Sequence, residues 1–165
     1  AGFADGIAAI FGRGAAYLLV FSVMLAWITL VVPRFFGFVS MVHAADILLF
    51  FIPYLLACIF FSMLVSEMVR YRESVMLVVV FSSIALLFMS GVSWPQSSIP
   101  PFWQGVSSLF PSTFAIRGFI RMSSMGALLG DCLPEYICLW LQTLLYFLIV
   151  VFVCLLRTRQ FATRP

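Results

Sequence analysis

Hydrophobic residues fill most of this chain, and charged side chains interrupt them at only a few places. Three charge-free intervals of about twenty residues lie at 14–33, 47–66 and 136–156. At ~1.5 Å of rise per residue, a helix of that length covers ~30 Å, which is the thickness of the hydrocarbon core of a bilayer. The pattern therefore predicts three membrane-spanning helices.

A fourth interval, 74–116, has no charge over 43 residues. Its first part, 74–90, is a continuous apolar run and predicts a fourth span. Its second part, 91–111, contains four prolines and cannot cross lipid as an unsupported helix. We expect 91–111 to form a re-entrant or interfacial helical hairpin within an outer-side cap at 91–135.

A short amphipathic helix is expected after Pro111, with Ser112 or Thr113 as its N-terminal cap. Arg117 and Arg121 lie four residues apart and so share one face of this helix. We expect that face to look toward the outer interface.

Composition agrees with lipid as the main solvent. Of the 165 residues, 64% are hydrophobic and 9% are charged, and the mean hydropathy is +1.18. A water-soluble domain carries roughly a quarter charged residues. The expected fold is an all-α integral membrane protein, with four transmembrane helices and the outer-side hairpin.

Several kinds of chemistry are excluded by missing residue types. All nine basic residues are arginines, so the lysine of a Walker A phosphate loop is absent. One histidine, His43, and four scattered cysteines do not supply a zinc motif. The net charge of +3 is small and is sorted by membrane side, which argues against nucleic-acid binding. We expect no catalytic residue, no metal and no cofactor bound by this chain.

Arginines also predict the topology. Four crossings place both ends of the chain on one side, and the side richer in arginine is expected to be cytoplasmic. The loop 67–73 and the tail 157–165 then lie in the cytoplasm. The richer side holds Arg13, Arg70, Arg72, Arg157, Arg159 and Arg164, and the other side holds Arg34, Arg117 and Arg121.

An ordered series of residues surrounds the predicted hairpin. It comprises Ser90-Gly91, Trp94-Pro95, Ile99-Pro100, Trp103-Gln104, Leu109-Phe110-Pro111, Thr113, Arg117, Arg121 and Met125-Gly126, with Gly12-Arg13 ahead of the first span. In order and spacing, over essentially the whole chain, this series resembles the permease subunit of type-2 ABC exporters.

The resemblance implies the last four helices of a six-helix permease half. The sequence begins at Ala1, without an initiator methionine or a charged segment ahead of a short apolar stretch, so we also expect a fragment of a longer protein without a signal peptide. Family members do not hydrolyse ATP. They pair with an ATP-binding subunit, and two permease halves enclose the export path in the bacterial cytoplasmic membrane.

Two sets of candidate residues follow from the resemblance. A cytoplasmic coupling segment at 1–13, with a short helix before the first span, and the loop after 66 would contact the ATPase. The hairpin would form an outer gate. Its prolines by themselves indicate only that a helix is interrupted there. The coupling set is Phe3, Ile7, Phe11, Arg13, Glu67, Arg70 and Arg72, and the gate set is Trp94, Pro95, Pro100, Pro101, Trp103 and Pro111.

Three other functions stay open at this point. An ion-coupled secondary transporter usually buries an ionisable group at mid-membrane, and no charge lies inside a predicted span. An intramembrane hydrolase would have to use Ser93 with His43 as its base. A structural membrane subunit without transport activity is the remaining alternative.

Overall fold

The computed structural model describes residues 3–37, 43–69 and 71–162, and all regular elements in these ranges are helical. The longer helices are α1 (Phe3–Ala26), α3 (Ala44–Met68), α4 (Arg72–Met89), α6 (Pro111–Met125) and α7 (Leu133–Ala162). Shorter elements are η1 (Trp27–Val31), α2 (Val32–Phe35), η2 (Gln96–Ser98), α5 (Pro101–Ser107) and η3 (Leu129–Cys132).

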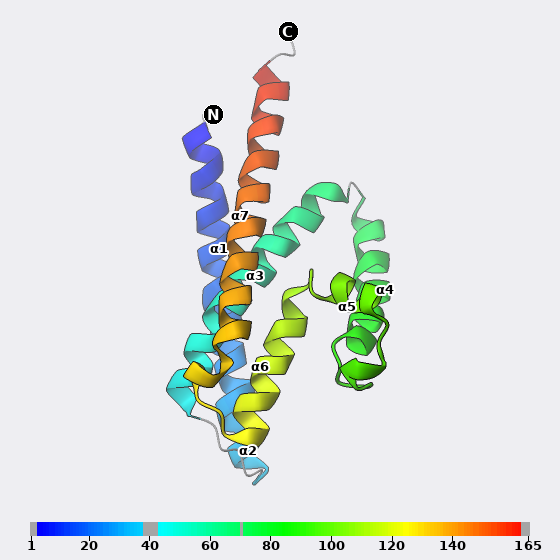
Figure 1. Ribbon diagram of the computed structural model, residues 1–165. Helices are drawn as coiled ribbons and strands as arrows, with labels where there is room; N and C mark the ends of the chain where they lie inside the picture. The colour runs from blue at the N-terminus through cyan, green and yellow to red at the C-terminus, as the bar shows by residue number, and fades with distance from the viewer. Residues whose placement is uncertain (1–2, 38–42, 70, 163–165) are drawn as a thin grey trace.

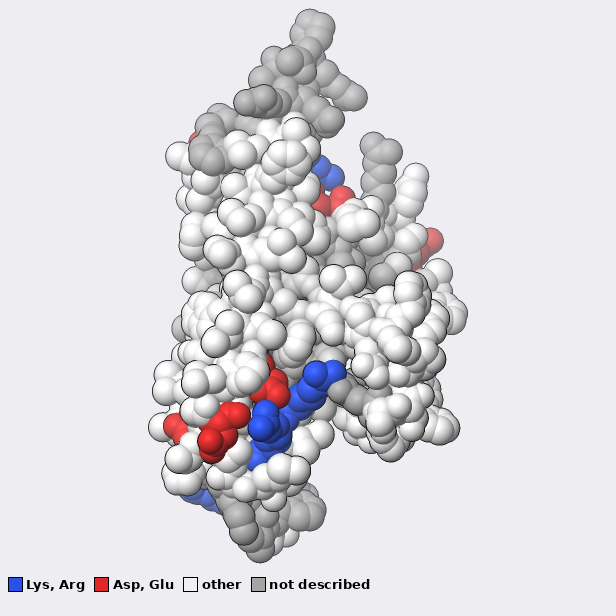
Figure 2. Space-filling view, viewed as in Figure 1, with Lys and Arg blue, Asp and Glu red and all other residues white. Residues whose placement is uncertain are grey.

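Four helical segments in the described part of the chain are long and apolar enough to cross a membrane. Figure 2 shows a broad uncharged surface, with charged side chains gathered near its lower part and fewer near its top. These features confirm the expected all-α membrane protein. The segments are Ala4–Phe35, Ala44–Met68, Arg72–Met89 and Leu129–Arg157.

The first of these segments differs from the sequence expectation. The coupling segment 1–13 was expected to hold a short helix separate from the first span, whereas α1 runs without a break from Phe3 to Ala26. It continues through the π-helical turn η1 into α2. Pro33 follows this turn, and because a proline ring clashes with the carbonyl four residues earlier, the widened turn lets the helix pass it without ending.

Helices α3 and α7 form the centre of the fold, and α1 packs beside them (Figure 1). The Thr143 hydroxyl lies 2.9 Å from the carbonyl oxygen of Pro53 in α3 and 2.8 Å from that of Leu139 in its own helix. Polar contacts of this kind hold helices together in lipid, where apolar packing alone offers little preference over acyl chains.

Helix α4 stands apart from this bundle (Figure 1). It buries none of its residues, and its closest partner is the short helix α5. After α4 the chain reverses, α5 runs back beside α4, and α6 descends along α3 and α7.

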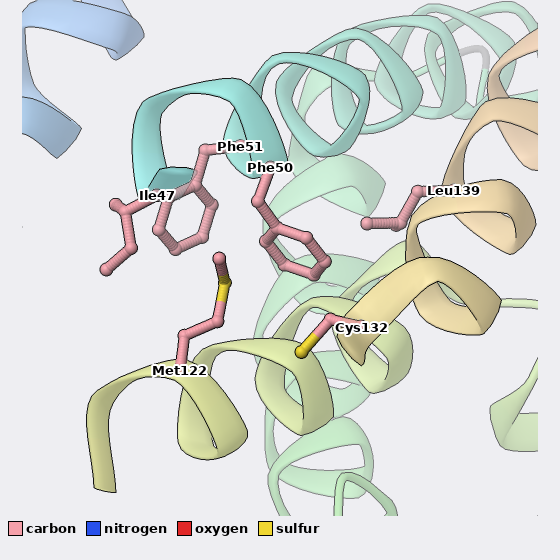
Figure 3. Packing of buried hydrophobic residues seen from close by; sticks show 6 residues of the cluster. All are labelled: Ile47, Phe50, Phe51, Met122, Cys132 and Leu139. Atoms are coloured by element: carbon pink, nitrogen blue, oxygen red, sulfur yellow. The ribbon is translucent and has the colours of Figure 1, made fainter. Parts of the chain in front are cut away.

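A cluster of buried side chains joins α3 and α7 to the C-terminal part of α6 (Figure 3). Phe50 and Phe51 from α3 lie among Met122, Cys132 and Leu139, and the two rings meet edge to face at 5.8 Å. This packing fixes α6 against the bundle and so positions the hairpin that precedes it.

Candidate functional site

Prolines begin α5, which lies within the predicted hairpin 91–111, and α6, which is the short helix expected after Pro111. In the structure we call α5 and α6 together the hairpin. Pro101 is in the first turn of α5, and Pro111 is in the first turn of α6. The fixed φ of proline and its missing N–H suit that position. The expected cap at Ser112 or Thr113 is therefore wrong: α6 begins at Pro111 without a side-chain cap, and the Thr113 hydroxyl instead donates to the carbonyl of Ser107 at 2.7 Å.

The remaining gate candidates lie in the reversal before α5 and on α5 itself. Trp94 and Pro95 are exposed in the reversal after α4, where Ser98 N–H donates to the carbonyl of Pro95 at 2.9 Å. Pro100 precedes α5, and Trp103 lies on α5 with its ring edge to face with Phe102. The structure thus places all six gate candidates between the end of α4 and the start of α6.

Two side chains of α7 hold the tip of the hairpin, which we define as residues 107–111. The Gln142 amide donates to the carbonyl of Ser108 at 2.5 Å, and the Tyr146 hydroxyl donates to the carbonyl of Leu109. Aromatic contacts add to this attachment, because the ring of Phe61 in α3 lies 5.5 Å from Phe110 and 5.3 Å from Tyr146.

The position of Tyr146 gives the depth of the tip. Tyr146 lies midway between Glu135 and Arg157, the charges that bound the last predicted span. It is eleven positions from each, which corresponds to ~16 Å of helix. The hairpin therefore reaches about half-way along α7, and its carbonyls meet donors at a depth where water is scarce.

Close packing and an ion pair hold α6, the second arm of the hairpin. A Cβ added at Gly118 would overlap the ring of Phe50, so only glycine allows this approach of α6 to α3. Nearer its end, the Arg121 guanidinium pairs with the Glu135 carboxylate of α7 at 3.0 Å. Arg117 shares the face of Arg121, and its guanidinium lies 5.8 Å from the centre of the Phe114 ring.

A second ion pair joins α3 and α7 at the end of the bundle where α3 finishes. The Arg157 guanidinium of α7 lies 2.7 Å from the Glu67 carboxylate near the end of α3, and both side chains are partly exposed. Glu67 was a coupling candidate, whereas Arg157 was considered only as a boundary of a span. Glu67 and Arg157 have opposite charges and end two predicted spans on the same side of the membrane. The sequence therefore contained enough information to predict this ion pair.

The other coupling candidates are spread along that end. The Phe11 ring lies 5.6 Å from Phe147 of α7, so this part of α1 packs along the last span. Ile7 is half-buried on α1, Arg13 is exposed there, and Arg72 begins α4. Phe3 begins α1, and Arg70 lies outside the described residues.

Within the described ranges, no group of three or more His, Cys, Asp and Glu side chains is placed to hold a metal ion. The hairpin and the Glu67–Arg157 pair are contacts between helices, at mid-membrane and at one end of the bundle respectively.

Together these features define a multi-pass α-helical membrane protein with a helical hairpin docked against the middle of its last span. A family model described as "ABC-2 family transporter protein" matches residues 5–152. No curated protein and no solved structure matches the chain. The chain belongs to the ABC-2 transporter family and is a membrane permease of ABC-type transport.

Proposed function

We propose that this chain forms the substrate path of an ATP-driven exporter and that ATP hydrolysis occurs on a partner subunit. The observation that carries the proposal is that α3 and α7 take part in both functional features. Near mid-membrane they hold the hairpin tip through Phe61, Gln142 and Tyr146. At the end of the bundle where α3 finishes they carry the Glu67–Arg157 pair.

This shared pair of helices supports a mechanical route from the Glu67 end to the hairpin. A displacement of the Glu67 end by an ATPase moves α3 and α7 as one body, because they pack on one another and share the Thr143 contact. The hairpin moves with them, since its tip is bonded to α7. Rigid-body motion of this kind opens one side of the path and closes the other.

A second permease half completes the proposed path. Helix α4 and the outward side of α5 present large apolar residues, among them Met76, Phe81 and Phe102, each more than 70% exposed. The proposed partner half, identical or different, lies on this side, and lipid covers the rest. The membrane is the bacterial cytoplasmic membrane, and both ends of the chain lie in the cytoplasm because that side carries more arginine.

Copurification tests the assignment of the energy source. Full-length protein extracted in mild detergent is expected to bring down an ABC ATP-binding subunit, or to carry one fused to it. The preparation is expected to hydrolyse ATP, and hydrolysis is expected to stop when the phosphate-loop lysine of that partner is replaced. A preparation with neither a partner nor a fused ATPase contradicts the proposal.

Exchanging the charges of the Glu67–Arg157 pair tests its role. Glu67→Arg is expected to lower the ATPase activity of the complex, and the double variant Glu67→Arg/Arg157→Glu is expected to recover it. The change in stability is expected to be below about 1 kcal/mol, because partly exposed ion pairs contribute little. Melting temperature and ATPase activity are measured on the same preparations, and a double variant as impaired as Glu67→Arg contradicts the role.

A further inference from the structure

A groove of about 620 Å³ runs between α1 and α3 and belongs to neither candidate set as a whole. Its volume is within the roughly 300–1,000 Å³ typical of small-molecule sites. One end carries Arg13 together with Ser62 and Ser66, and the remainder is lined mainly by apolar and aromatic side chains.

The antiparallel register of α1 and α3 orders these residues along the groove. A Cβ at Gly14 would lie 3.9 Å from the Met63 side chain, which places Arg13 beside the second half of α3. At the far end, Leu25 and Tyr54 pack against the same buried cluster. The polar residues therefore form one end of the groove and the apolar lining extends from them toward the opposite side of the membrane.

The groove is long enough to hold an acyl chain. Its lining extends from Arg13 on α1 to Ile28 on η1, which is ~22 Å of helix. One leaflet contributes only ~15 Å of the ~30 Å hydrocarbon thickness, so a chain that enters at the polar end can lie within the groove. Tyr17, Met24 and Ile28 are each more than half exposed along this length, so the groove is open along its side.

The Arg13 guanidinium at the mouth of the groove is exposed and available to an anion. Among the described residues, no carboxylate forms an ion pair with Arg13, since the two ion pairs found there join Arg121 to Glu135 and Arg157 to Glu67. An arginine near the border of the hydrocarbon region is costly unless it reaches an opposite charge or the interface. The Ser62 hydroxyl donates to the carbonyl of Cys58 at 2.8 Å. Ser66 is exposed at the same end of the groove.

We propose that this groove binds one anionic phospholipid from the leaflet on the Arg13 side. The phosphate lies at the Arg13 guanidinium, which offers the paired donors that phosphate oxygens accept. One acyl chain lies along Tyr17, Met24 and Ile28. Basic pockets between membrane helices take anionic headgroups for the same reason. This inference does not depend on the proposed ATP coupling.

Native mass spectrometry of the full-length protein tests the proposal, with phosphatidylglycerol and phosphatidylcholine of identical acyl chains as probes. The native sequence is expected to retain phosphatidylglycerol about fivefold more strongly, the effect of one basic residue near a membrane surface. Arg13→Gln is expected to remove this preference. Arg34→Gln, the same change toward the other end of the same helical segment, is expected to preserve it.

A second variant tests whether a lipid occupies the groove, by narrowing it beside its polar end. Ser62→Phe places a ring in the groove and is expected to lower retention of both lipids severalfold. Equal retention of the two lipids by the native sequence overturns the proposal, as does a preference that survives Arg13→Gln or retention unaffected by Ser62→Phe. A Ser66→Cys disulfide to a second copy, absent in the parent, also overturns it by showing that protein covers the groove.

Discussion

Removing both α7 donors that hold the hairpin tip, with Gln142→Leu and Tyr146→Phe together, is expected to detach the tip from the last span. The carbonyls of Ser108 and Leu109 then lose the side chains that bond them. An unpaired carbonyl away from water costs about 1–3 kcal/mol. Hydrogen exchange of the amides in 101–111 is expected to accelerate at least about tenfold, since ~1.4 kcal/mol corresponds to a factor of ten.

Tyr136→Phe is the matched control, because it makes the same chemical change on the same helix. The Tyr136 ring packs on Phe50 and Trp140, and its hydroxyl forms no hydrogen bond to another described residue. This variant is expected to leave exchange in the hairpin unchanged. Equal exchange in the double variant and the native protein would show that the tip is held by something other than these two bonds.

Gly118→Ala is expected to have the largest effect on stability. The added methyl group overlaps the Phe50 ring, so either the ring must turn or α6 must move away from α3. Overpacking of a buried contact costs about 1–3 kcal/mol, and here it also displaces the arm that carries the hairpin. A lower melting temperature of the full-length protein in detergent is the measurement.

Gly105→Ala supplies the control for this change. Gly105 also lies in a helix, but no atom lies within 4 Å of its added Cβ, so this variant is expected to be at least as stable as the native protein. Combining Gly118→Ala with Phe50→Leu is expected to recover part of the loss, because the two positions are in contact. If Gly118→Ala is as stable as Gly105→Ala, the close approach of α6 to α3 is contradicted.

The distribution of charge predicted three of the four membrane-spanning helices, although not where the first of them begins. Charged residues are too costly to leave in hydrocarbon, so the intervals between Arg13 and Arg34, or Glu135 and Arg157, mark segments that can cross. Prolines similarly predicted that 91–111 interrupts the pattern of spans. Charges and prolines can both be recognised at single positions in the sequence. Each is informative because such a residue is energetically unfavourable in a helix that crosses lipid.

The contacts between helices could not be predicted from the sequence. Tyr146 and Gln142 are ordinary members of an apolar span until the hairpin tip is placed beside them. Gly118 gives no sign of its contact with Phe50, because their approach depends on the packing of two helices distant in sequence. Helical periodicity shows which residues share one face of a helix. It does not show which other helix packs against that face, because tertiary packing decides this.

The continuity of α1 was missed for a related reason. Arg13 was taken as a boundary between a coupling helix and a span, but a charge on an exposed helix face does not stop a helix. The side chain of an arginine can reach the interface while its backbone remains helical inside the membrane. The roles of Phe3, Ile7 and Phe11 in ATPase contact stay predictions.

The central claim is that ATP on a partner moves the outer hairpin, and labelling of a cysteine on α5 tests it most directly. Gly105→Cys occupies open space and is introduced into the full-length protein, reconstituted in liposomes with its ATP-binding subunit. The rate of reaction with a membrane-impermeant maleimide is compared in nucleotide-free and vanadate-trapped states, with the parent protein as background. We predict a severalfold change in rate that disappears when the ATPase is inactive. Equal rates in both nucleotide states would contradict the claim.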